Sequence, residues 1–149
     1  MPAAGARVGV ALLFALYLAV LVWTVLWKLH LPYVGSGGMR VIKLVPFAAG
    51  GGFGASAPVE VLQNIVVFVP FGIGLRLLAR SWSGWRIVGV VAGASLALEI
   101  AQYVLAVGRS DATDVLTNAF GGAAGVALVV LARAGEVSPR PSPAGAPRR

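Results

Sequence analysis

Three of the five carboxylate side chains of this chain fall within one short stretch, together with an arginine and two amides. The surrounding residues are mostly apolar. Ionisable groups inside membrane-spanning segments cost roughly 2.5–3.5 kcal/mol each on insertion scales, so such a group of residues marks a candidate functional site. With one amide from an earlier segment, the candidate polar cluster consists of Asn64, Glu99, Gln102, Arg109, Asp111, Asp114 and Asn118.

Glu99 and Asp114 are the candidate catalytic residues of this cluster. Two neighbouring carboxyls can carry out acid–base chemistry or hold a divalent cation through oxygen ligands. The Asp111-x-x-Asp114 spacing is too short a motif to diagnose a metal site. A single histidine and the absence of cysteine exclude multi-histidine and thiolate sites. We therefore assign no metal and no cofactor, and the sequence leaves open whether the chain is an enzyme.

Several of these polar residues also have a purely structural interpretation. Asp111 is a good N-cap for a helix that begins after it, and its charge suits the positive end of the helix dipole. Asn64 and Gln102 can join membrane helices through hydrogen bonds. Glu99 is harder to explain in this way, although it can serve as a structural partner of Arg109.

The composition is that of an integral membrane protein. Hydrophobic residues make up 58% of the 149-residue chain and charged residues 11%, with a mean hydropathy of +0.88. A soluble domain has about 25% charged residues. The net charge of +7 resembles that of a nucleic-acid-binding protein. In a membrane protein, basic residues that accumulate in cytoplasmic loops explain it better, so we expect the lipid bilayer and no nucleic acid as a partner.

Four apolar segments are long enough to cross about 30 Å of hydrocarbon. We expect an all-α membrane protein, a bundle of four transmembrane helices forming one domain over residues 1–132. Residues 133–149 are rich in Pro, Ala and Arg, and we expect a disordered basic cytoplasmic tail there. Glycine pairs spaced four apart, in Gly89-x-x-x-Gly93 and Gly121-x-x-x-Gly125, predict close helix packing. The predicted spans are Val8–Trp27, Val61–Leu78, Ile87–Val107 and Ala112–Leu131.

The first outer loop contains an apolar run, Val41–Phe47, that is too short to cross a membrane. Glycines and prolines across residues 31–47 argue against a regular fifth span. We therefore expect an interfacial or re-entrant segment in this loop.

Helical spacing predicts which polar groups meet. At 100° per residue, Asp111, Asp114 and Asn118 share one face of the fourth span, while Glu99 and Gln102 share a face of the third. A short connection makes these two spans antiparallel neighbours. We expect the two faces to form one outward-opening pocket with Asn64 nearby, and Arg109 to reach inward to Glu99 or Asp111.

Four motifs occur in a fixed order along successive spans, and together they resemble the VanZ-like family of small bacterial membrane proteins. The resemblance covers about Val8 to Leu131. It implies a role in the cell envelope or in the glycopeptide response, because the family is named for a component associated with reduced teicoplanin sensitivity. The motifs are Lys43-Leu-Val-Pro46-Phe47, Asn64 through Pro70-Phe-Gly72, Glu99-x-x-Gln102, and Arg109-x-Asp111-x-x-Asp114-x-x-x-Asn118-x-x-Gly121.

Three classes of function remain open. The chain can bind or modify an envelope lipid, such as a lipid-linked wall precursor. It can be a non-catalytic interaction module for a larger envelope enzyme, or form a homo-oligomer. It can also be a small proton-coupled transporter element, in which a carboxyl at the membrane midplane is a usual relay group.

The basic residues predict the topology of the chain in the bacterial cytoplasmic (inner) membrane. With both termini cytoplasmic, eight basic residues lie inside and four outside. A reporter fused after Arg149 should therefore be cytoplasmic, and one inserted near Gly51 should be extracytoplasmic. Paired alkaline phosphatase and fluorescent-protein fusions check this, and two reporters on the same side would rule out the four-span arrangement.

Overall fold

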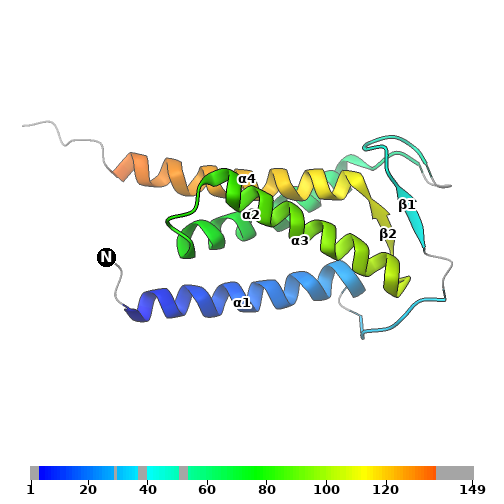
Figure 1. Ribbon diagram of the computed structural model, residues 1–149, viewed down its shortest axis with the longest axis horizontal. Helices are drawn as coiled ribbons and strands as arrows, with labels where there is room; N and C mark the ends of the chain where they lie inside the picture. The colour runs from blue at the N-terminus through cyan, green and yellow to red at the C-terminus, as the bar shows by residue number, and fades with distance from the viewer. Residues whose placement is uncertain (1–3, 29, 37–39, 51–53, 137–149) are drawn as a thin grey trace, which may run out of the picture.

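The computed structural model describes residues 4–28, 30–36, 40–50 and 54–136, and these form four long helices and a pair of short strands (Figure 1). All four helices are long and apolar enough to cross a membrane. The predicted fold class, an all-α membrane bundle of four helices, is confirmed. The helices are α1 (Ala4–Trp27), α2 (Pro58–Leu78), α3 (Gly84–Leu105) and α4 (Ala112–Glu136).

The helix ends differ modestly from the predicted spans. The largest difference is at α4, which continues to Glu136 rather than stopping at Leu131. The first residues of the expected disordered tail are therefore helical. The remainder of that expectation concerns residues 137–149, which lie outside the described residues.

α2 and α4 pack at backbone contact. A Cβ added at Gly121 would collide with the carbonyl oxygen of Ile65, and one at Gly125 with that of Val69. Small residues at such positions let two membrane helices approach closely, as the sequence predicts for this pair. The other glycine pair does not pack in this way. Gly89 and Gly93 of α3 are exposed and meet no neighbour within 4 Å among the described residues, so that prediction is wrong for the single chain.

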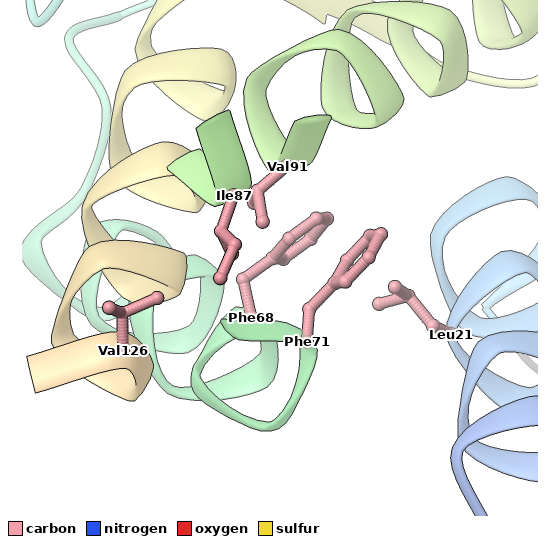
Figure 2. Close-up of a cluster of buried hydrophobic side chains, with 6 residues drawn as sticks. All are labelled: Leu21, Phe68, Phe71, Ile87, Val91 and Val126. Atoms are coloured by element: carbon pink, nitrogen blue, oxygen red, sulfur yellow. The ribbon is translucent and has the colours of Figure 1, made fainter. Parts of the chain in front are cut away.

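An apolar core joins the helices in one half of the bundle (Figure 2). Phe68 and Phe71 of α2 stack with ring centroids 6.0 Å apart, and Ile87 and Val91 of α3 are fully buried against them. Leu21 of α1 packs against the same cluster. This core leaves the polar residues to the other half, toward the end of the bundle that carries the strands.

The two strands pair across the end of the bundle, as Figure 1 shows. β1 (Val41–Lys43) runs parallel to β2 (Arg109–Asp111), with Lys43 opposite Asp111. The apolar run of the first outer loop, predicted as interfacial or re-entrant, thus contributes a strand. This pairing satisfies backbone N–H and C=O groups that would otherwise need water.

The α2–α4 contact predicts a difference between two glycines of similar sequence context. Gly125→Leu should force the helices apart and destabilise the protein by about 1–3 kcal/mol or more, because the added side chain meets backbone. Gly93→Leu adds the same atoms at an open position and should have little effect. Thermal unfolding in detergent measures both, and equal loss in the two variants would contradict this packing.

Candidate functional site

A buried ion pair lies where β1 meets the start of α4. Lys43 Nζ is 2.8 Å from Asp111 Oδ2, and the two side chains are 3% and 4% exposed. The strand register places these residues opposite one another, so the pair follows directly from the β1–β2 pairing. Removing one partner of such a pair leaves an uncompensated buried charge, which is strongly destabilising.

Asp111 connects four segments of the chain. Its Oδ1 accepts the Thr113 N–H at 2.8 Å and so caps the first turn of α4, as the sequence predicts. Its Oδ2 also accepts the Ser56 hydroxyl at 3.2 Å. Burial acts to raise the pKa of Asp111, but the hydrogen bonds from Lys43 and Thr113 outweigh it and hold that pKa below its ordinary value. The carboxylate is thus held ionised beside Lys43.

Glu99 is attached to the backbone of the same strand. Its Oε2 accepts the Asp111 N–H at 2.8 Å, and its own backbone oxygen accepts the Ser110 hydroxyl at 2.7 Å. The residue is 6% exposed. These two hydrogen bonds fix the C-terminal part of α3 against β2, and they bring Glu99 and Asp111 into the same site.

Two further polar contacts continue into the bundle along α4. Asn64 of α2 donates to Asp114 Oδ1 at 2.7 Å, and Asn118 donates to the Ser95 hydroxyl of α3 at 2.8 Å. The Asn118 Oδ1 atom is buried and has no hydrogen-bond partner among the described residues. Hydrogen bonds therefore join α4 to α2 at Asp114 and to α3 at Asn118, about one helical turn further along.

The remaining predicted residues lie at the edge of this cluster. The Arg109 guanidinium lies 3.8 Å from Glu60, which also caps α2 by accepting the Ala57 N–H. We expected Arg109 to pair with Glu99 or Asp111, but in the structure the Asp111 carboxylate forms its ion pair with Lys43. Gln102 donates to the Val25 carbonyl of α1 at 2.9 Å, so it joins two helices.

A pocket of about 320 Å³ opens beside the ion pair, between β1, α3 and α4. Its walls are apolar, and Ile42, Leu44, Leu96 and Leu116, which form much of them, are each at least 51% exposed. The polar residues that border it are Lys43, Glu99 and Asp111. Asn64, Gln102, Arg109, Asp114 and Asn118 are not among the residues that line it. The structure therefore divides the predicted cluster between the pocket border and the helix contacts beneath it.

Sequence reasoning missed Lys43, Ser56 and Thr113 as site residues. Lys43 carried a usable signal, because a lysine within the apolar run Val41–Phe47 needs a carboxylate partner if it is buried. Ser56 and Thr113 carried none, since isolated hydroxyl residues are common at helix starts. The Thr113 hydroxyl accepts the Phe47 N–H at 2.9 Å, which holds the end of the first loop against α4.

The arrangement does not resemble an activated serine. Lys43 Nζ lies 2.8 Å from the Ser56 hydroxyl, the distance expected of a nucleophile and its base. In that contact, however, Lys43 is the donor and the serine oxygen the acceptor, and the same Nζ atom is paired with the Asp111 carboxylate. The geometry thus favours a positioning role for these groups, and it makes the border of the pocket polar and rigid.

The ion pair predicts a recovery of stability on double substitution. Lys43→Met should cost about 3–5 kcal/mol by leaving Asp111 buried and unpaired. Lys43→Met/Asp111→Asn should regain much of this, although Asn caps the helix less completely than the charged group. Arg109→Met, a control on the more exposed pair, should lose less. Thermal unfolding in detergent measures all three, and a double variant no more stable than Lys43→Met would disprove the coupling.

The chain is similar to known proteins over most of its length. A protein-family model described as VanZ/LLP1 matches residues 14–133. Over 121 residues the chain is 37% identical to protein VanZ from Enterococcus faecium. The matched residues make up 80% of this chain and 72% of that protein. No solved structure matches the chain.

The matched region contains the four motifs, the strand pair and the ion pair described above. The four membrane-spanning helices and this match identify a multi-pass membrane protein with an envelope-associated role of the VanZ kind. The chain belongs to the VanZ family.

Proposed function

We propose that this VanZ family member binds an envelope lipid or lipid-linked wall precursor by holding part of its apolar chain in the pocket beside the Lys43–Asp111 ion pair. The observation that carries the proposal is the combination of apolar walls with a polar border. Ligand pockets in proteins typically have volumes of about 300–1,000 Å³ and apolar linings with a few fixed polar groups, and this pocket falls at the small end of that range.

The position of the pocket supports an amphipathic ligand. Its walls come from β1 with the residues after it and from the exposed faces of two spanning helices, α3 and α4. The exposed helix faces let a lipid chain enter sideways from the bilayer. The ion pair and Glu99 lie at the border near the strand end of the bundle, where a headgroup would emerge. A strongly polar, water-soluble ligand would gain little free energy from contact with apolar walls.

The contacts favour binding over chemical modification of the ligand. Of the two candidate catalytic carboxyls, Glu99 borders the pocket, whereas Asp114 is hydrogen-bonded to Asn64 on α2 and does not line it. Acid–base catalysis shared between these two carboxyls requires both of them within hydrogen-bond reach of the same bound molecule. We therefore assign Glu99 a positioning role at the border of the pocket.

A proton-coupled transporter element receives less support. The polar links of α4 continue as far as Asn118, and beyond it the apolar core of Phe68, Ile87 and Val91 fills the space between the helices. A relay would need polar groups or water across that region. The packed core argues for a site that is open at one end only.

An interaction module is the second candidate function, and one observation favours it. Gly89 and Gly93 leave an exposed, shallow face on α3. Helices with small residues at this spacing often pack against a second membrane helix, from an envelope enzyme or from another copy of the chain. Gly93→Leu would weaken such an assembly without filling the lipid pocket, so the two functions can be separated.

The topology bears on which lipid reaches the pocket. We propose that both termini are cytoplasmic and that the protein resides in the bacterial cytoplasmic membrane, in accord with the excess of basic residues on that side. The strand end of the bundle then faces outward. A pocket at that end would sample lipids of the outer leaflet, where wall precursors are used.

The proposal is tested by filling the pocket. Leu116→Trp places a large side chain at the pocket wall, and Leu128→Trp makes the same change elsewhere on α4 at a leucine of similar exposure. Native mass spectrometry of protein extracted with its own lipids should show a retained lipid in the wild type and in Leu128→Trp, with at least a severalfold loss in Leu116→Trp. Equal retention in all three would contradict the proposal.

A further inference from the structure

A second, smaller pocket lies at the opposite end of the bundle from the strands, between the start of α1 and the end of α2. Its volume is about 100 Å³. Val10, Leu77 and Leu78 supply apolar side chains, and Arg7 and Arg80 stand at its border. Because α1 and α2 are antiparallel spans, both arginines lie at the same membrane–water interface. The pocket thus combines an apolar groove with two guanidinium groups at headgroup level.

Among the described residues, no carboxylate lines the second pocket. Within the described part of the chain, neither Arg7 nor Arg80 forms an ion pair. Four of the five acidic residues, Glu60, Glu99, Asp111 and Asp114, belong to the strand end, since they lie at the start of α2, the end of α3 and the start of α4. The fifth, Glu136, ends α4 at the same end of the bundle as the second pocket, but it is not among the described residues that line this pocket. A ligand that supplies negative charge at the second pocket would therefore complement it.

Neighbouring arginines of the same end are already engaged in structural contacts. Arg76 donates to the carbonyl of Trp82 at 2.9 Å and so stabilises the connection between α2 and α3. The Arg86 guanidinium lies over the Trp82 ring at 5.6 Å. The Arg80 Nε–H donates to the Leu77 carbonyl, and this hydrogen bond holds the Arg80 guanidinium beside the pocket. These contacts distinguish the Arg7 and Arg80 pair from a general basic surface.

We propose that this pocket binds an anionic membrane lipid, with the headgroup phosphate between Arg7 and Arg80 and an acyl chain along the groove formed by Val10 and Leu77. Guanidinium groups suit phosphate because they offer several N–H donors in a planar fork. Basic pockets between spanning helices at an interface are a recognised setting for anionic headgroups. The proposal is independent of the function assigned to the strand-end pocket.

The lipid would have a structural consequence for α1. The middle of α1 is attached to the bundle by Phe14, which packs on Phe71, and by Tyr17, whose hydroxyl donates to the Val67 carbonyl. Earlier in the helix, Val8, Leu12 and Leu13 are each at least 58% exposed. A phosphate held by Arg7 and Arg80 would bridge the start of α1 to the end of α2 and attach this otherwise loosely packed part of the helix.

The test compares two lipids of identical acyl chains, anionic phosphatidylglycerol and zwitterionic phosphatidylcholine, added in equal amounts to the purified full-length protein. Native mass spectrometry gives the ratio of the two bound lipids. In Arg7→Gln/Arg80→Gln this ratio should fall about thirtyfold, as expected for the loss of two basic residues near an anionic headgroup. Arg86→Gln/Arg133→Gln removes the same charge from the same end of the bundle, outside the pocket, and should keep the wild-type ratio.

Hydrogen exchange of the wild-type protein provides a second readout that does not depend on the variants folding. Phosphatidylglycerol, compared with phosphatidylcholine, should slow exchange at the start of α1 and the end of α2 and leave the strand end unchanged. Retention of the lipid preference in Arg7→Gln/Arg80→Gln would overturn the proposal. An equal fall in the control variant would overturn it too, because the preference would then come from overall basic charge. Equal exchange rates at the start of α1 in the two lipids would also overturn the proposal.

Discussion

The buried ion pair between Lys43 and Asp111 is the contact on which the strand end of this protein depends. Asp111 receives the Lys43 ammonium, caps α4 through Thr113 and donates its own N–H to Glu99. A single residue thus holds three parts together: its carboxylate joins the first loop to the start of α4, and its backbone N–H attaches the end of α3. Burying two charges is unfavourable unless the remaining polar atoms are also satisfied, and Ser56 supplies the additional contact.

The two halves of the bundle are stabilised by different physical interactions. In one half, Phe68, Ile87 and Val91 pack as an apolar core, and α2 and α4 meet at glycine positions. In the other half, hydrogen bonds join α4 to α2 and α3, and the ion pair attaches β1 to β2 at the start of α4. Such polar contacts are directional, so they can hold the border of the neighbouring pocket in one geometry while its apolar walls stay accessible to lipid. We propose that this division suits the small bundle to binding an amphipathic molecule.

The spans and several local contacts could be predicted from the sequence because each depends on nearby residues or on average composition, and the family could be predicted from the resemblance of four motifs in a fixed order. Apolar length identified the four helices, and Asp111 was recognisable as an N-cap. The partner of Asp111 could not be predicted in the same way. Lys43 reaches it through a parallel strand pair, and such a pairing joins segments that are far apart in sequence. Arg109 was the nearer cation, but it lies beside Glu60. The spacing of Gly89 and Gly93 does not say which helix would pack there, and within the described residues nothing lies within 4 Å of a Cβ added at either position.

The most direct test of the account measures the Lys43–Asp111 contact in a bilayer. The chain has two lysines, so a Lys28→Arg background leaves Lys43 as the single site for a ¹⁵N side-chain label. Solid-state NMR can then record dipolar dephasing between this nitrogen and ¹³C-labelled aspartate carboxyls. The account predicts strong dephasing, as the 2.8 Å separation of Nζ and Oδ2 requires, and its loss in Asp111→Asn with selective aspartate labelling. Absence of dephasing in the labelled protein would contradict the central claim.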